Sequence, residues 1–263
     1  MKINKVGRVV TVKMEILSEA DQSYVKGRLA EAKLRDRKFE TSPFGEMIKG
    51  EWVKVEKEMY GIPFQVYGTK RLLRSKTPVP LFLHLHGAGA RATEIKLGKV
   101  EIAPKEVIAG DRYDKNPSLV IVPLCPPDTS WGDHVAAIEK IVDALLKTAP
   151  VDHNRLYLSG YSMGARGCDS LIKSRPKFYA AALLADGAPN KNWVKITDTA
   201  LWLVYSGERE LKEAERVVKE YQDAGKVAQF KGFPEAGHNQ IHWKLAKGKK
   251  VFRWMFEQVR SVK

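Results

Sequence analysis

The sequence predicts an α/β fold, in which a mostly parallel sheet carries helices on both faces. Three observations predict it. Short apolar segments alternate with amphipathic helical segments along most of the chain. Several of the strand segments are apolar on both faces, as buried parallel strands are. One of these strands also runs directly into a helix through Gly160-Tyr-Ser-Met-Gly164. With 263 residues, the chain is long enough for one large α/β domain.

The composition indicates an ordinary globular protein. Hydrophobic residues make up 44% of the chain, which is too many for a disordered protein. No segment approaches the roughly 18 consecutive apolar residues that a membrane-spanning helix needs. The first residues lack the apolar core of a secretory signal, so we expect no signal peptide in the chain as given. The sequence leaves the cellular compartment undecided. The protein is cytoplasmic, or it is exported if the chain as given is truncated.

The net charge is strongly basic, with 45 lysines and arginines against 31 acidic residues and a formal charge of +14. The basic residues are spread along the chain and match no zinc-finger, basic-zipper or RNA-binding pattern. We therefore expect a solvated basic surface and no nucleic-acid partner, with attraction of anionic substrates or surfaces as the alternative. Cys125 and Cys168 show no spacing typical of a disulfide or a metal site, and we expect both to be small buried apolar residues.

Two parts of the chain are expected, an N-terminal extension with a linker at 1–43 and the main domain at 44–263. The extension contains an alternating strand at 8–15 and a helix that starts at Ser18. The main domain begins with an antiparallel hairpin around Tyr60-Gly61. The remaining strands are expected at 79–85, 119–124, 156–159, 180–187, 200–206 and 227–233, and the helices within 96–110, at 135–149, after Ser162, at 212–224 and at 251–262.

The pentapeptide Gly160–Gly164 has the G-x-S-x-G pattern at a turn from strand to helix. A serine at the apex of such a turn has a strained backbone, and its hydroxyl is pushed clear of the sheet. The flanking residues must be small so that the helix can begin close to the strand. The start of the helix also offers free backbone N–H groups and a positive dipole end, which favour developing negative charge. Ser162 is therefore the candidate nucleophile.

Other polar residues follow the ends of neighbouring strands. His86-Gly-Ala-Gly89 follows the strand at 79–85, and its glycines let backbone N–H groups approach a bound oxygen. Acidic residues follow two later strands, at Asp186 and at Glu208 and Glu210. His238 follows the last strand. The chain order of serine, carboxylate and histidine is the order found in α/β-hydrolase triads.

Several sequence motifs resemble those of α/β-hydrolases, and the resemblance covers roughly residues 50–260. The motifs are LHLHGAGAR, VIVPLCPPDTSW, GYSMGARG, YSGERE and PEAGHNQ. Within that superfamily the chain is similar to the dienelactone-hydrolase-like esterases and to a "predicted peptidase" group related to feruloyl and polyhydroxybutyrate-type esterases. The resemblance implies the α/β-hydrolase fold. No long insertion follows the strand at 180–187, so we expect no large cap domain.

The resemblance implies a catalytic triad in which Ser162 is the nucleophile and His238 the base. In similar esterases the acid commonly stands three positions after the glycine that ends a strand, which favours Glu210. Two departures weaken that match, because Glu replaces the usual Asp and Ser206 replaces the usual His. Asp186 and Glu208 remain alternatives for the acid.

The oxyanion hole is expected from the backbone N–H groups of Met163 and Ala88, with Gly89 as a substitute for Ala88. Gly87, Trp131 and Tyr161 are the candidate substrate-binding residues, although a tryptophan in the core is an equal alternative for Trp131. Arg166, on the first turn of the helix, could meet an anionic acyl group.

The remaining histidines are weaker candidates. His242 is the only rival base. His84 and His86 share a strand face but lack a third ligand, so no metal and no cofactor is expected.

The function predicted from these residues is that of a serine hydrolase, which cleaves carboxylic esters through an acyl-serine intermediate. One alternative is a serine peptidase of the same fold, which would use the same mechanism. The other is a hydrolase-like binding module that catalyses no reaction. The expected substrate is a small or polymer-linked ester. The sequence leaves the acyl chain, the alcohol and the oligomeric state open.

Overall fold

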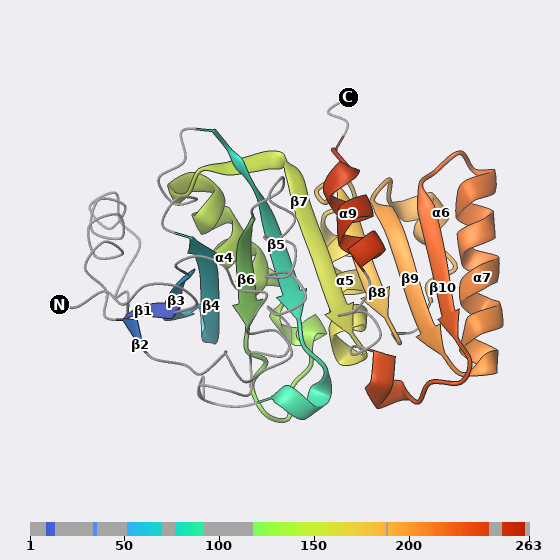
Figure 1. The fold of residues 1–263 in the computed structure, drawn as a ribbon, viewed down its shortest axis with the longest axis horizontal. Coiled ribbons are helices and arrows are strands. Elements are labelled where there is room, and N and C mark those ends of the chain that lie inside the picture. Colours follow the sequence, from blue (N-terminus) through green and yellow to red (C-terminus); the bar gives the residue numbers. More distant parts are fainter. Residues whose placement is uncertain are drawn as a thin grey trace.

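The computed structural model describes residues 9–13, 34–35, 52–69, 77–91, 118–187, 189–241 and 249–260. Its strands form one ten-stranded sheet in the order β10-β9-β8-β7-β5-β6-β4-β3-β1-β2 (Figure 1). The strands are β1 Val9–Lys13, β2 Leu34–Arg35, β3 Trp52–Met59, β4 Ile62–Thr69, β5 Val79–Leu85, β6 Leu119–Pro123, β7 Val151–Tyr161, β8 Ala181–Ala185, β9 Ala200–Ser206 and β10 Ala228–Phe233. Every neighbouring pair from β10 to β6 is parallel.

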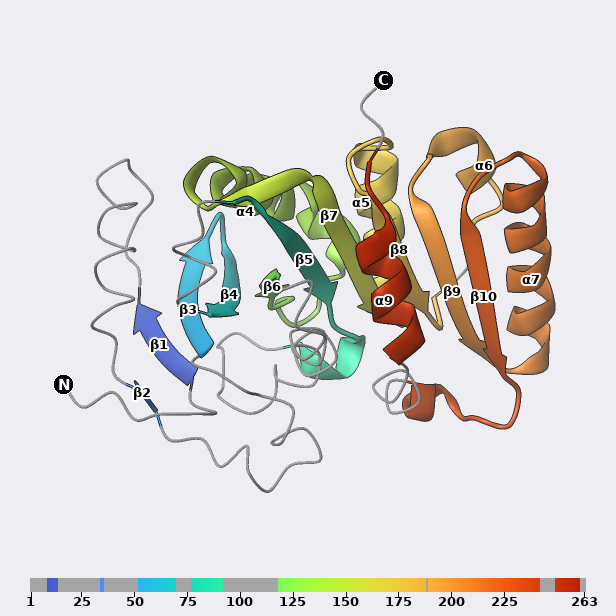
Figure 2. The same cartoon turned by 45° about the horizontal axis from the view of Figure 1, so that its top comes forward.

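Helices cover both faces of the sheet, which confirms the predicted α/β architecture. The described helices are α4 Val135–Thr148, α5 Met163–Ser174, α6 Trp193–Ile196, α7 Glu208–Asp223 and α9 Lys249–Glu257, with 3₁₀ turns η3 Ala88–Ala90, η5 Trp131–His134 and η6 His238–Gln240. Alternate residues of the central strands point to opposite faces. One set packs with α4 to α7 and the other with α9 (Figures 1 and 2).

The predicted hairpin is present as β3 and β4, which pair antiparallel. Tyr60 and Gly61 both have positive φ, 56° and 77°, the conformation of the tight turn that suits the twist of two strands. β4 joins the parallel strands by antiparallel pairing with β6. Beyond β3 lie β1 and β2, so two short strands of the predicted extension belong to the same sheet. The division of the chain at residue 43 stays a prediction.

Some predictions fall on segments outside the described residues, namely the helix from Ser18, the linker, the connection at 96–110 and His242. No described helix has the length and hydropathy that a membrane span would require. Only residues 186–192 connect β8 to α6, so no cap domain is inserted at that point.

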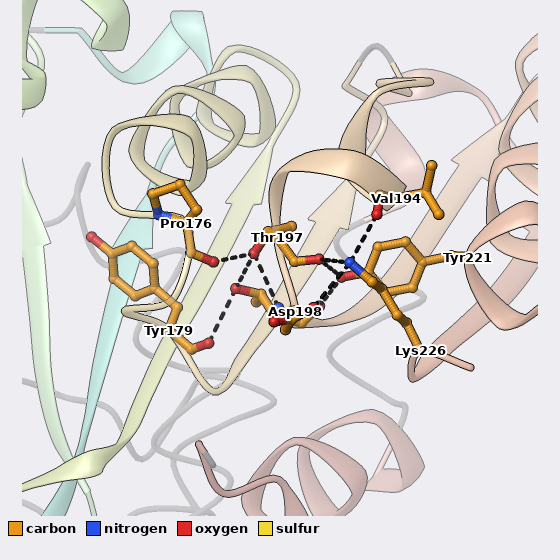
Figure 3. A network of polar contacts seen from close by, with 8 residues as sticks. Pro176, Tyr179, Val194, Thr197, Asp198, Tyr221 and Lys226 are labelled. Atoms are coloured by element: carbon orange, nitrogen blue, oxygen red, sulfur yellow. Dashed lines mark hydrogen bonds and ion pairs between the residues drawn. The ribbon is translucent and has the colours of Figure 1, made fainter. Parts of the chain in front are cut away.

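A polar network surrounds the residues that lead into β9 (Figure 3). It lies at the edge of the sheet where β9 begins, opposite to the edge where the parallel strands end. The Tyr221 hydroxyl donates hydrogen bonds to the carbonyl oxygens of Thr197 and Thr199, at 2.8 and 2.9 Å. The Lys226 ammonium donates to the same Thr197 oxygen at 2.7 Å and pairs with Asp198 at 2.9 Å. Because these carbonyls would otherwise be buried without enough donors, the network stabilises the connection that leads into β9.

Candidate active site

The candidate site lies where β5, β7, β8, β9 and β10 end side by side at one edge of the sheet (Figure 1). Ser162 stands between β7 and α5 with φ 55° and ψ −116°. A non-glycine residue in this region carries backbone strain, as expected for a serine at the apex of a sharp turn. The Ser162 backbone N–H donates to the Ala185 carbonyl at 2.8 Å, which ties the turn to the end of β8.

Gly164 lets α5 start directly against the sheet. A Cβ at this position would lie 1.8 Å from the Leu85 carbonyl oxygen at the end of β5, far closer than two non-bonded atoms can approach. Gly160 is restricted in the same way, because its Cβ would lie 2.3 Å from the carbonyl oxygen of Gly164. The small flanking residues of the motif are therefore required by packing.

Three side chains from separate segments form one hydrogen-bonded line. The Nε2 atom of His238 lies 3.0 Å from Ser162 Oγ, and its Nδ1 atom lies 2.9 Å from Asp186 Oδ2. Since a carboxylate only accepts, Nδ1 carries the proton that is donated to Asp186, and Nε2 is left to accept from the serine hydroxyl. The Asp186 side chain is 4% exposed, whereas that of His238 is 51% exposed. The line therefore runs from a buried carboxylate to the surface.

Glu210 was predicted to be the carboxylate beside His238. That prediction is wrong, because the carboxylate hydrogen-bonded to His238 belongs to Asp186. α7 begins at Glu208, four residues before the predicted start, so Glu210 lies in its first turn. There the Glu210 carboxylate lies close to Gly207, at the positive end of the helix, where an acidic side chain is favourable. Glu208, also in this turn, is likewise exposed.

Ser206, at the end of β9, is a contact of Asp186 that the sequence did not indicate. Its backbone N–H donates to Asp186 Oδ1 and its hydroxyl donates to Oδ2, both at 2.7 Å. In the sequence, Ser206 stood out only as a departure from the usual histidine. The adjacent, parallel course of β8 and β9 was the signal that could have connected the two residues.

His86 is a structural residue of the loop after β5. Its Nδ1 bonds to the Gly87 carbonyl at 2.8 Å, and its Nε2 accepts from the backbone N–H of Cys125 at 3.1 Å. Burial lowers the pKa of His86 to about 4, and the imidazole is therefore neutral near pH 7.

Trp131 does not form the predicted wall of the substrate site. Its side chain is 1% exposed, its indole N–H donates to the His86 carbonyl at 2.9 Å, and its ring meets the His86 ring edge-on. Trp131 is a core residue, the alternative left open by the sequence.

Each of the two residues predicted for the oxyanion hole is the first residue of a helical segment. Met163 is the first residue of α5 and Ala88 the first of η3, so neither N–H has an acceptor within its own turn. A Cβ on Gly87 would lie 3.0 Å from the Tyr161 ring, which places the loop beside the turn that holds Ser162. The oxyanion role of Met163 and Ala88 and the substrate-binding role of Gly87 stay predictions.

Tyr161 contacts the histidine segment. Its hydroxyl donates to the His238 carbonyl at 2.7 Å, and the two ring centroids are 4.9 Å apart. Burial, with a smaller contribution from the negative charge of Asp186, raises the pKa of Tyr161 to about 12. The residue therefore helps to hold the histidine loop, and its predicted contact with substrate stays a prediction.

A cavity of about 790 Å³ opens on the carboxylate side of the hydrogen-bonded line. Residues that line it include Arg166, Asp186, Tyr205, Glu210, Glu213 and His238. Because Asp186 and His238 line it, the cavity adjoins the hydrogen-bonded line at its carboxylate end.

The other predicted polar residues lie elsewhere. The Nδ1 atom of His84 lies 2.6 Å from Ser159 Oγ inside the sheet. Cys125 and Cys168 are buried free thiols. Within the described ranges, no three His, Cys, Asp or Glu side chains are placed to hold a metal ion.

Comparison with known proteins shows the fold. No protein-family model matches the chain, and no curated protein sequence matches it. A thermostable esterase superimposes with a TM-score of 0.64 at 22% identity, over 81% of this chain and 66% of that one. A feruloyl esterase module from Clostridium thermocellum, in complex with sinapinate, gives 0.62 at 10% identity, over 87% and 94%.

An acylaminoacyl peptidase from Pyrococcus horikoshii gives a TM-score of 0.60 at 11% identity, over 88% of this chain and 45% of that one. The chain thus spans less than two thirds of the length of the esterase and less than half of the peptidase. These neighbours are α/β-hydrolase folds, so the chain has the α/β-hydrolase fold, as its sequence predicted.

Proposed function

We propose that the chain is a serine hydrolase that cleaves carboxylic esters through an acyl-Ser162 intermediate. The proposal rests on one observation, the line of two hydrogen bonds from Ser162 through His238 to Asp186, at 3.0 and 2.9 Å. A serine hydroxyl is a weak nucleophile until a neighbouring base accepts its proton, and an oriented imidazole does so. The strained backbone at Ser162 adds support, since it is typical of a nucleophile held at a sharp turn.

In the acylation step, His238 Nε2 accepts the hydroxyl proton while Ser162 Oγ forms a bond to the carbonyl carbon of the ester. The carbonyl electron pair moves to oxygen and gives a tetrahedral oxyanion. As this intermediate collapses, the bond from the carbonyl carbon to the alcohol oxygen breaks, and the imidazolium gives its proton to the departing alcohol.

Deacylation repeats these steps with water. His238 accepts a proton from the water as its oxygen bonds to the acyl carbon. The bond between that carbon and Ser162 Oγ then breaks, the serine regains the proton, and the carboxylic acid leaves. The buried Asp186 carboxylate stabilises the imidazolium in both steps and keeps its Nδ1 proton in place.

We assign the oxyanion hole to the backbone N–H groups of Met163 and Ala88. Met163 follows the nucleophile directly, and Ala88 belongs to the loop whose Gly87 lies against Tyr161. Donors that point at the developing charge before the reaction starts need no reorganisation, and each contributes on the order of 3 kcal/mol to the transition state.

The direct test is the Ser162→Ala variant, assayed with p-nitrophenyl acetate and butyrate. We expect kcat to fall at least about a thousandfold, because the nucleophile is removed. Ser170→Ala is the matched control, since Ser170 lies on the same helix and its hydroxyl bonds, among the described residues, to the Arg166 carbonyl alone. Wild-type activity in Ser162→Ala would refute the proposal.

A serine peptidase is the second candidate, because one structural neighbour is an acylaminoacyl peptidase. Higher kcat/KM for acylated peptides than for matched esters would favour it. A fluorophosphonate probe separates both enzymes from a binding module. We expect labelling of the wild type and none of Ser162→Ala, whereas an unlabelled wild type would indicate that the scaffold only binds.

A further inference from the structure

Two residues that line the cavity beside Asp186, Tyr205 and Arg166, carry hydrogen-bond donors that have no acceptor among the described residues. The Tyr205 hydroxyl is buried and has no hydrogen-bond partner, although its side chain is only 1% exposed and lines the cavity. In the part of the chain that the structure describes, the Arg166 guanidinium on α5 forms no ion pair or hydrogen bond. A buried hydroxyl without a partner is unfavourable by about 1–3 kcal/mol, so an acceptor at this position would be stabilised.

The two donors belong to residues that line the same cavity, and the charge of Arg166 acts on the Tyr205 hydroxyl. Burial and the negative charge of Asp186 raise the pKa of Tyr205 well above its usual range, while the positive charge of Arg166 opposes that shift. The hydroxyl is therefore the neutral, donating form at any physiological pH. An arginine beside a phenolic donor is an arrangement suited to a carboxylate, which accepts from both.

The other charged groups of the cavity already have partners or favourable positions. Asp186 accepts from His238 and Ser206. Glu213 pairs with Arg216 at 2.9 Å and with Lys191 at 3.4 Å. Glu210 lies at the start of α7 and lines the cavity, so its charge, like that of Asp186, would repel an anionic ligand.

We infer that Arg166 and the Tyr205 hydroxyl bind a carboxylate on the alcohol part of the ester. The inference rests on the proposed function. In that mechanism the alcohol oxygen must receive its proton from His238, so the alcohol part lies on the histidine side of Ser162. The cavity that holds the two donors is lined by His238 itself. The substrate class is therefore an ester of a hydroxy acid or of a carboxyphenol.

The test compares 4-acetoxybenzoate with 4-acetoxybenzamide, two acetyl esters that differ in the charge of the leaving alcohol. We expect the wild type to favour the carboxylate in kcat/KM. Arg166→Met should lower the ratio of the two kcat/KM values about tenfold or more, the size expected for a lost charged hydrogen bond. Tyr205→Phe should lower the ratio about threefold and leave the melting temperature unchanged or higher, because the hydroxyl has no partner to lose.

Two further variants make the result specific. Glu210→Gln should raise the ratio, since it removes the repelling charge, and a misfolded site would not produce opposite changes. Arg253→Met is the matched control, because it removes one exposed positive charge on α9, on the other face of the sheet, and should leave the ratio as in the wild type.

Binding of the product 4-hydroxybenzoate to Ser162→Ala protein separates this inference from the proposed function. Calorimetry needs no turnover, and the affinity should fall about tenfold when Arg166→Met is added. An inactive wild type that still binds 4-hydroxybenzoate through Arg166 would refute the ester hydrolase and keep the carboxylate site. Two results with an active wild type would overturn the carboxylate site. One is the same ratio of kcat/KM values in Arg166→Met as in the wild type, and the other is an affinity for 4-hydroxybenzoate that does not change when Arg166→Met is added.

Discussion

Ser206 donates two hydrogen bonds to Asp186, one from its backbone N–H and one from its hydroxyl, each 2.7 Å long. The Asp186 carboxylate, at the end of β8, is thereby fixed from the neighbouring strand β9. The remaining acceptor capacity of Oδ2 is directed at His238. An oriented carboxylate is what an imidazole base requires to keep one tautomer and one position.

The sequence allowed three carboxylates as partner of the base, Glu210, Asp186 and Glu208, and substitution distinguishes Asp186 from the favoured Glu210. We expect Asp186→Asn to lower kcat for p-nitrophenyl acetate about a thousandfold or more, because the amide no longer stabilises the imidazolium. The loss in Glu210→Gln should be at least about a hundredfold smaller, since that side chain lies at the start of α7. The reverse order would return Glu210 to the triad.

Ser206→Ala removes one of the two hydrogen bonds from β9 to Asp186. We expect kcat to fall about tenfold with little change in KM, because a hydrogen bond to a charged group contributes roughly 1.5–3 kcal/mol. The effect should vanish when Asp186 is already Asn, since Ser206 acts through that carboxylate. An equal loss of kcat in both backgrounds would show that Ser206 acts in some other way.

Gly164→Ala should strongly destabilise the fold. The added Cβ would lie 1.8 Å from the Leu85 carbonyl oxygen, and both are backbone positions that cannot rotate away. We expect the free energy of unfolding in urea to fall by about 3 kcal/mol or more. Gly89→Ala is the control, because open space surrounds its Cβ. Similar stabilities of the two variants would contradict the close contact of α5 with β5.

Tyr221→Phe tests the network of Figure 3. Loss of the hydroxyl leaves the Thr199 carbonyl without that donor, while Thr197 keeps Lys226. We expect the free energy of unfolding to decrease by about 1–3 kcal/mol. Tyr205→Phe provides the comparison, because its hydroxyl has no partner to lose. If both variants lose the same stability, the network contributes nothing beyond the burial of the rings.

The lowered pKa of His86 leads us to expect that the free energy of unfolding decreases in mild acid. Burial lowers its pKa from 6.5 to about 4 in the folded chain, so between these pH values the unfolded chain binds the proton and the folded chain does not. The contribution of His86 is fully present above pH 6.5 and is lost as the pH falls toward 4, by about 3 kcal/mol in total.

Urea unfolding at pH 7, 5.5 and 4.5 measures this loss, and the NMR titration of the His86 ring assigns it. A ring that titrates near pH 6.5 in the folded protein would contradict the prediction.

Local sequence patterns were enough to predict most of the described strands and helices and their order. The apolar pattern of the strands predicted β5 to β10, and the Tyr60-Gly61 pair predicted the turn between β3 and β4. The strand–turn–helix pattern around Ser162, with small residues on both sides, predicted the position of the serine. These features depend on local periodicity and backbone geometry, so a single sequence carries them.

The carboxylate that meets His238 could be identified only from contacts between distant segments. Asp186 and Glu210 follow adjacent parallel strands, and both strands end at the same edge, so chain order allowed either. The earlier start of α7 moved Glu210 into a helical turn, while Ser206 fixed Asp186 beside the histidine. The burial of Trp131 and the unpartnered hydroxyl of Tyr205 were decided in the same way. Contacts between strands depend on how the sheet brings distant residues together, and no local pattern records that.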